Sequence, residues 1–274
     1  MSYAYFDDIV CITLNSSLER QKHAEFFFKK LNIPCRFFIA HKHPNGGMYG
    51  CFDSHIQVLK NAYKKGLNNI LVLEDDFLPT DSYSEDRLNK AIQFMKTNKD
   101  WDIFHLGYSF IKDDIYTGIT TVFNGKYITD DIVQYNPFCT QALCYSKRAI
   151  KQIVENYNDY IGLVHYDMFI ATHLKLKNYC IVPMLFDQNF YFEHNNSSTD
   201  GIEAFIRMIM PLFTFTKLNY RITLLKYWYQ KYKNTKRFLH MLILSLIIYK
   251  IKGAVVSSKK LYINDIGFNG TNRC

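Results

Sequence analysis

Residues 68–79 read NNILVLEDDFLP, and this stretch decides the fold that we expect for the rest of the chain. The short apolar run from Ile70 to Leu73 is typical of a strand buried on both faces of a parallel α/β sheet. Three carboxylates end it, and alternation along a strand predicts Glu74 and Asp76 on one side and Asp75 on the other. At the carboxyl end of a parallel strand such a pair can hold a divalent cation. An acidic, solvated turn would have the same sequence.

The chain before this stretch alternates between strand and helix patterns. We expect a strand at 8–14, a helix at about 18–31 capped by Ser16 or Ser17, a strand at 35–40 and a helix at 51–65 that Gly66 ends. With the strand at 70–76 this makes β-α-β-α-β, the pattern of a doubly wound α/β sheet.

The chain after this stretch continues in the same style as far as about residue 182. The elements that we expect there are a helix at 85–97, a strand at 101–107, a loop or small hairpin at 108–136, a strand at 140–145, a helix from 146 to 156 capped by Ser146, a helix at 165–176 and a last strand at 179–182.

Composition describes a globular protein. With 274 residues, 48% apolar content, 12 Gly and 6 Pro, the chain can form one large domain or a domain with an appendage. Seven cysteines without a CxxC pair favour reduced thiols over a disulfide framework or a zinc site. The N-terminus has no basic segment followed by an apolar run, so we expect a cytoplasmic protein without a signal peptide.

The basic charge is concentrated near the C-terminus. Residues 204–264 contain twelve Lys and Arg and no Asp or Glu, so the net charge of +8 leaves −4 for the remainder. We therefore expect a catalytic domain at 1–203 and a basic, apolar, helical segment at 204–274. Its longest apolar run, 238–249, is shorter than the roughly 20 residues that span a bilayer. Peripheral contact with a membrane surface is the favoured role, packing as scaffold follows closely, and nucleic-acid binding is not expected.

Two classes of α/β protein place acidic residues after an apolar strand and use a metal. P-loop nucleotidases also need a GxxxxGK[ST] motif, which this sequence lacks. Nucleotide-sugar transferases hold Mn²⁺ or Mg²⁺ against a nucleoside diphosphate and need no P-loop, because the cation stabilises the charge on the leaving diphosphate. A metal-dependent nucleotidyltransferase is a rival, but its Gly-rich N-terminal loop is missing.

The order of motifs resembles glycosyltransferase family 25, which includes lipopolysaccharide and collagen galactosyltransferases. The matching stretches are IVCITLNSSLERQKHAEFFFKKLNIPCRFFIA, GCFDSHIQVLKNAYKKGLNNILVLEDD, WDIFHLGY and QALCYSKRAIKQI, within roughly residues 8–195. This resemblance implies a GT-A fold, a UDP-sugar donor, a divalent metal and an inverting transfer of a hexose, galactose or glucose, to a hydroxyl of a glycan, a lipid-linked glycan or hydroxylysine.

The resemblance also assigns residues near the donor. Glu74 and Asp76 take the metal and diphosphate positions, with Asp76 the stronger candidate for a direct ligand. The other matched positions, expected near the nucleotide or its sugar, are Leu14, Asn15, Arg20, His55 and Asp75. A guanidinium at Arg20 can pair with phosphate, although a solvated helix-face arginine is an equal alternative. A hydrogen-bonded structural role for His55 is the stronger alternative.

An inverting transfer needs a base to deprotonate the acceptor hydroxyl. Asp167 matches the family's aspartate and is the candidate, against the alternative of a helix-capping residue. His194 is a candidate third metal ligand. Gln188 resembles the family's late glutamine, but the residues after it depart from the pattern and leave the acceptor open. A functional rival of another class is an inactive GT-A module that acts as a binding or scaffold subunit.

Overall fold

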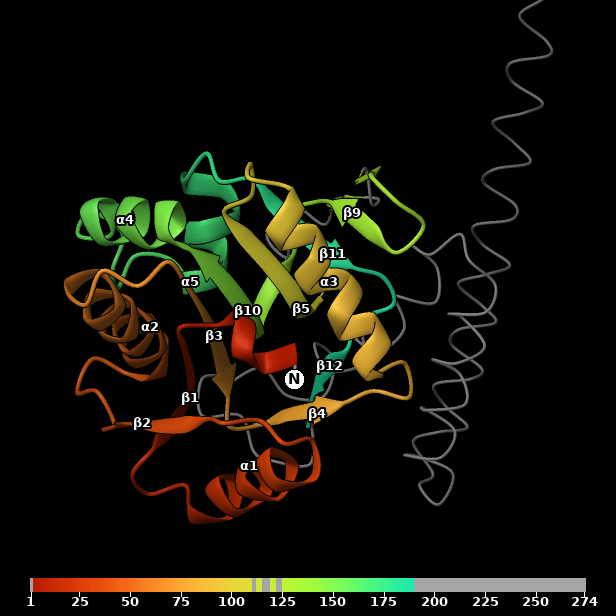
Figure 1. The fold of residues 1–274 in the computed structure, drawn as a ribbon. Coiled ribbons are helices and arrows are strands. Elements are labelled where there is room, and N and C mark those ends of the chain that lie inside the picture. Colours follow the sequence, from red (N-terminus) through yellow and green to blue (C-terminus); the bar gives the residue numbers. More distant parts are fainter. Residues whose placement is uncertain (1, 110–111, 115–118, 122–124, 190–274) are drawn as a thin grey trace, which may run out of the picture. The chain divides into compact units, whose positions relative to one another are not determined.

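The computed structural model describes residues 2–109, 112–114, 119–121 and 125–189 (Figure 1). The predicted boundary at 203/204, the basic segment after it and His194 lie outside these residues. Among the helices of the described part, none is long and apolar enough to cross a membrane.

Ten strands of the described chain form one twisted sheet (Figure 1). Its path runs through β2 (Arg36–Ala40), β1 (Asp8–Leu14), β3 (Asn69–Glu74), β10 (Phe138–Ser146), β5 (Ile103–Ser109), β11 (Asn178–Ile181), β9 (Ile132–Gln134) and β8 (Lys126–Tyr127). Off this path, β12 (Phe186–Gln188) pairs with β5 and with β4 (Phe77–Pro79). A separate hairpin is formed by β6 (Lys112–Asp114) and β7 (Ile119–Thr121).

The direction of the central strands confirms a mixed α/β fold with a mostly parallel sheet. β2, β1 and β3 pair in parallel, and so do β5 and β11. β10 is inserted between β3 and β5 and runs antiparallel to both. Five of these six strands therefore point the same way, and their carboxyl ends lie at one edge of the sheet.

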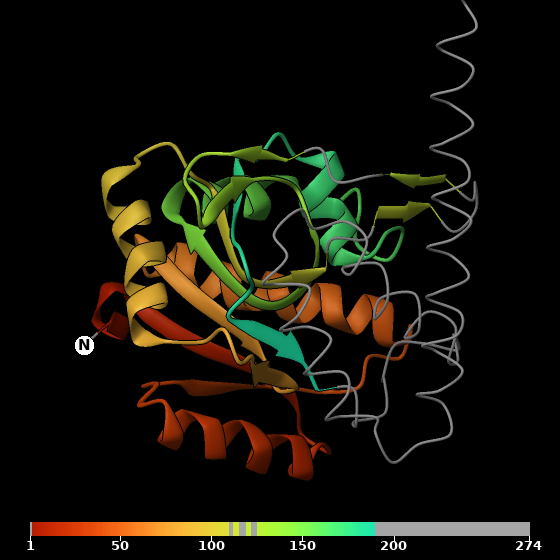
Figure 2. The same ribbon diagram turned by 90° about the vertical axis from the view of Figure 1, so that its right-hand side faces the viewer.

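Helices cover both faces of the sheet. α1 (Leu18–Lys30) and α3 (Glu85–Thr97) contribute to one buried cluster, and α2 (Gly47–Lys64) and α4 (Lys147–Asn156) contribute to the other. Figure 2 shows α1 and α3 seen from the side. The short elements are a 3₁₀ turn η1 (Ser2–Tyr5), α5 (Tyr166–Met168) and a π-helical turn η2 (Phe169–His173).

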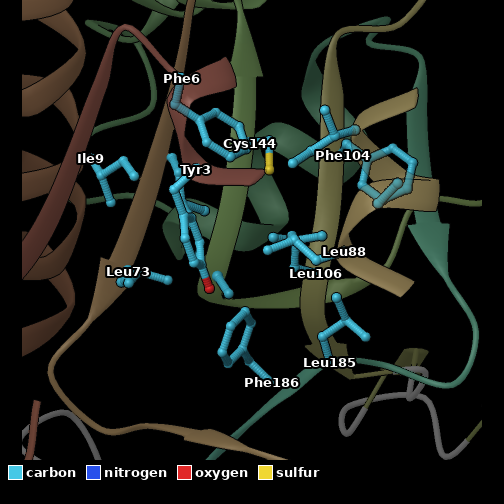
Figure 3. Packing of buried hydrophobic residues seen from close by; sticks show 14 of the residues in the cluster. Tyr3, Phe6, Ile9, Leu73, Leu88, Phe104, Leu106, Cys144, Leu185 and Phe186 are labelled. Carbon is cyan, nitrogen blue, oxygen red and sulfur yellow. The ribbon is translucent and has the colours of Figure 1, made fainter. Parts of the chain in front are cut away.

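β3 is buried on both faces, as its apolar run predicts. Leu71 and Leu73 belong to the cluster under α1 and α3, and Ile70 and Val72 belong to the opposite one. In the first cluster, the ring of Tyr3 from η1 lies beside β3 (Figure 3). The strand is thereby held rigidly from both sides, and its carboxylate-bearing end has a fixed position.

Several boundaries differ from the predictions. α2 begins at Gly47 and not at 51, because Gly46, at φ +93°, lets the chain turn into the helix earlier. The helix expected at 165–176 is a single α-turn followed by η2. β3 ends at Glu74, so strand alternation does not extend to the next two residues.

Two strands of the sheet, β4 and β12, were not predicted. They have three residues each, which is too short for a period of two to be visible. They exist because they pair with each other. Within 108–136, where a loop or a small hairpin was expected, β8 and β9 form an antiparallel hairpin, and β9 also pairs with β11. Long-range pairing has no local signature in the sequence.

Candidate functional site at the end of β3

Arg20 of α1 binds the second and third carboxylates of the acidic run. Its Nε lies 2.7 Å from Asp75 Oδ1, and its terminal nitrogen lies 2.5 Å from Asp76 Oδ2. The Thr13 hydroxyl of β1 donates to Asp75 Oδ2 at 2.6 Å. The expectation that Asp75 points away from Asp76 was therefore wrong, because both residues lie in the turn after β3 and converge on one guanidinium.

Glu74 has a different set of partners. Its Oε1 lies 3.2 Å from His55 Nε2 of α2 and accepts a short hydrogen bond from the Thr140 hydroxyl of β10. The His55 ring stacks on Tyr166, with centroids 4.4 Å apart and an angle of 12° between the planes. The acidic run thus divides at the end of the strand: Glu74 faces α2 and β10, and the two aspartates face α1.

Burial controls the electrostatics of this cluster. Asp76 is 5% exposed, and burial raises its pKa to about 7 even though Arg20 opposes the shift. Burial also raises the pKa of Asp75, again against Arg20. Burial alone would raise the pKa of Glu74 too, but the hydrogen bond and charge of His55 and the Thr140 hydroxyl outweigh it and leave this pKa below its usual range. The one guanidinium therefore does not fully offset the effect of burial on the pKa of the two aspartates.

Asp76 also keeps an oxygen that can bind a cation. Its Oδ1 is buried and has no hydrogen-bond partner among the described residues. A buried carboxylate oxygen without a donor is costly, and a divalent cation is one of the groups that remove this cost. The residues present therefore fit the expected Mn²⁺ or Mg²⁺.

The other predicted residues lie around this end of the sheet. β1 pairs Ile12 with Glu74 and continues for two more residues to Leu14, so Leu14 and the exposed Asn15 lie beyond the acidic strand end. The carbonyl of Leu14 accepts from the Gln21 side chain at 2.8 Å, and the amide of Asn15 donates to Ala40 at 2.8 Å. Both residues are placed at the edge where a nucleotide was expected.

Asp167 is the second residue of α5, and its side chain reaches across to β10. Its Oδ2 accepts from the amide of Cys139 at 3.0 Å, and its Oδ1 accepts from the amide of Met168 at 2.8 Å. Cys139 has a φ of +68°, and the next residue is Thr140, which donates to Glu74. Asp167 thus holds the strained start of β10 beside the acidic cluster.

One group of residues was missed by sequence reasoning. Cys51, His55 and Glu74 place one sulfur, one nitrogen and one oxygen within 4.8 Å of one another. The only local signal is the spacing of Cys51 and His55, four residues apart on α2, which puts them on one helix face. Cys51 belongs to no CxxC pair, and Glu74 joins the group only through the fold.

Comparisons with known proteins find likeness in structure only. No protein family matches the sequence, and no curated protein sequence is similar to it. A glycosyltransferase involved in glycosylation of the major capsid of PBCV-1 aligns at 10% identity and a TM-score of 0.40, over 68% of this chain and 94% of that chain. A UDP-glucose pyrophosphorylase complexed with UDP-glucose aligns at 10% identity and a TM-score of 0.38, over 66% of this chain and 74% of that chain.

A third structure is a Drosophila beta1,4-galactosyltransferase 7 variant in complex with manganese, UDP-Gal and xylobiose. It aligns at 12% identity and a TM-score of 0.35, over 72% of this chain and 79% of that chain. At TM-scores below 0.5, these alignments carry no argument about the fold or the function of this chain. The assignment of a function depends on the residues at the end of β3.

Proposed function

We propose that this protein is a metal-dependent inverting glycosyltransferase of the GT-A type, similar to family 25, which moves a hexose from a UDP-sugar to an acceptor hydroxyl. The observation that carries the proposal is the carboxylate run at the end of β3, where buried Asp76 keeps an oxygen without a partner among the described residues. A diphosphate brings a divalent cation to such an oxygen, and the cation when bound stabilises charge on the leaving group.

The residues around Asp76 have separate roles in this proposal. Asp76 is the principal ligand for the cation, because its buried Oδ1 has no hydrogen-bond partner among the described residues. Arg20 keeps both aspartates in place and carries a positive charge toward the diphosphate. Leu14 and Asn15 border the nucleotide at the edge of β1.

Asp167 is the proposed base. Each of its oxygens accepts one backbone amide, and an ionised carboxylate has about four lone-pair sites, so it can also accept the acceptor hydroxyl. The acceptor oxygen forms its bond to the anomeric carbon while the bond from that carbon to the diphosphate breaks. The hydroxyl proton goes to Asp167, and UDP leaves with the bonding electron pair.

The acceptor and the membrane belong to the proposal as well. The acceptor class is a glycan, a lipid-linked glycan such as that of lipopolysaccharide, or hydroxylysine, and residues 204–264 would hold the enzyme at a membrane surface. His194 would add a third ligand to the cation. His194 and residues 204–264 lie outside the described part of the chain. Their roles and the acceptor class follow from composition and from the family resemblance alone.

The test measures thermal stability of the full chain with UDP, UDP-galactose, UDP-glucose and GDP-mannose, each with and without Mn²⁺. A UDP compound at a hundred times its dissociation constant should add about 2.7 kcal/mol, and only with Mn²⁺. Asp76→Asn should lose this stabilisation, and Asp81→Asn, a change at an exposed turn, should keep it. Absence of any UDP effect in the wild type would favour an inactive module whose aspartates Arg20 alone neutralises.

A further inference from the structure

A second group of ligand-type side chains lies directly beside the proposed diphosphate site. Cys51 and His55 come from α2 and Glu74 from the end of β3, and their candidate ligand atoms all lie within 4.8 Å of one another. His55 is 1% exposed, and its Nδ1 has no hydrogen-bond partner in the described chain. One nitrogen of this buried imidazole therefore has no polar partner in the described part of the protein.

The three side chains are held in place by neighbours that do not belong to the group. Stacking on Tyr166 fixes the plane of the His55 ring, and the Thr140 hydroxyl donates to Glu74. Metal sites are commonly supported in this manner, by outer partners that orient the ligands. The 3.2 Å between His55 Nε2 and Glu74 Oε1 is close to the roughly 3.3 Å edge of a tetrahedron with bonds of about 2.0–2.1 Å.

We propose that Cys51, His55 and Glu74 form a binding site for a zinc-type transition metal, separate from the Mn²⁺ or Mg²⁺ position at Asp76. A thiolate and an imidazole favour Zn²⁺, whereas Mg²⁺ and Mn²⁺ prefer carboxylates, carbonyls and water. Three protein ligands leave a fourth position, the arrangement of zinc sites that bind water or a substrate group. The fourth ligand is water or an oxygen of the substrate that occupies the adjacent end of β3.

Binding changes the protons at the site in a defined way. The metal binds the ring nitrogen of the neutral His55 imidazole that carries no proton, so the imidazole releases none. The Cys51 thiol releases its proton to solvent as the sulfur binds. One proton is therefore released for each metal ion bound, as expected when a thiol becomes a ligand. The inference does not depend on the transferase proposal, since it uses different ligand chemistry.

Cobalt(II) tests the site, because it takes zinc geometry and absorbs in the near ultraviolet when bound to a thiolate. The full chain, stripped of metal by a chelator, should bind one Co²⁺ with this absorption and release one proton. Cys51→Ser should abolish the absorption, while Cys35→Ser, the same change at another half-buried cysteine, should leave it unchanged. Thr140→Val should weaken Co²⁺ binding about 10- to 100-fold, the usual cost of losing an outer partner.

The proposal would be overturned by no thiolate absorption in the wild type, or by equal absorption in Cys51→Ser. The melting temperature of metal-free Cys51→Ser shows that any loss is not due to unfolding. Asp76→Asn should keep the cobalt absorption while losing Mn²⁺-dependent stabilisation by a UDP compound. Loss of both in that variant would refute two separate sites, whereas loss of the UDP effect alone concerns only the transferase proposal.

Discussion

Arg20→Ala is the most informative single change in the cluster, since one guanidinium holds two buried aspartates. Asp75 and Asp76 are each 5% exposed, and the side chain of Arg20 is 14% exposed. Removing Arg20 would leave two carboxylates away from water without their cationic partner. We expect a clear loss of stability, because burial already raises the pKa of both carboxyl groups with Arg20 in place.

The size of the loss follows from three contributions. Removing one partner of a buried ion pair costs about 3–5 kcal/mol, and we take about 3 because Arg20 keeps some exposure. Arg20 is the third residue of α1, where the helix dipole disfavours a positive charge, so its removal returns about 0.5 kcal/mol. Alanine is itself a good helix former. The net loss of about 2.5 kcal/mol lowers the melting temperature by about 5–10 °C for a chain of this size.

Arg36→Ala is the matched control. Arg36 also forms a fork-like pair with an aspartate, Asp8, but its side chain is 48% exposed. A pair of this kind contributes about 0–1 kcal/mol. Thermal melts of both variants beside the wild type therefore compare the same substitution in two environments. If Arg20→Ala melted within a degree of Arg36→Ala, our account of the buried cluster would be wrong.

Divalent cations extend this experiment. With the guanidinium gone, Mn²⁺ should stabilise Arg20→Ala more than it stabilises the wild type, since Arg20 then no longer competes for the two carboxylates. A cation at a hundred times its dissociation constant contributes about 2.7 kcal/mol, close to the expected loss. An equal Mn²⁺ effect on both proteins would argue against cation binding by these aspartates.

The remaining predictions concern stability away from the cluster. Burial lowers the pKa of His105, which is hydrogen-bonded to Asn178, to about 4. Between pH 6.5 and 4 only the unfolded chain takes up this proton, so the free energy of unfolding should fall by up to about 3 kcal/mol as the pH drops through this range. Denaturant titrations at pH 7.5 and 4.5 should show a smaller fall in His105→Gln; an identical fall would contradict this. Ser146→Ala should cost about 1 kcal/mol, because its hydroxyl caps α4 at the amide of Ala149, whereas Ser17→Ala, without such a bond, should melt near the wild type.

The sequence predicted those parts of the fold that depend on local pattern. β1, β2, β3 and the helices α1, α3 and α4 lie within one or two residues of their expected positions, because each has a clear apolar period or an end signal. The reversed direction of β10 could not be predicted. Nothing within Phe138–Ser146 distinguishes a parallel from an antiparallel strand, and the direction depends on pairing with β3 and β5.

The candidate site was predicted in its location but not in its internal partners. The position of the carboxylates at a strand end follows from the apolar run. Arg20 was expected to face a phosphate or solvent, and its ion pairs with both aspartates were not predicted. The division between Glu74 and the aspartates could not be predicted, because it depends on the strand ending two residues earlier than expected. His194 and the basic segment at 204–264 stay predictions, since they lie outside the described residues.

The early end of β3 separates the two metal positions that we propose. Glu74, the last residue of the strand, has its direction set by the pleat and meets His55 and Thr140. Asp75 and Asp76 follow in a turn, where the chain is free to direct both toward Arg20. A strand longer by two residues would have placed the side chains of Glu74 and Asp76 on the same side of the sheet. Nitrogen and sulfur ligands therefore gather beside Glu74, and oxygen ligands gather around Asp76, so the two positions should differ in metal preference.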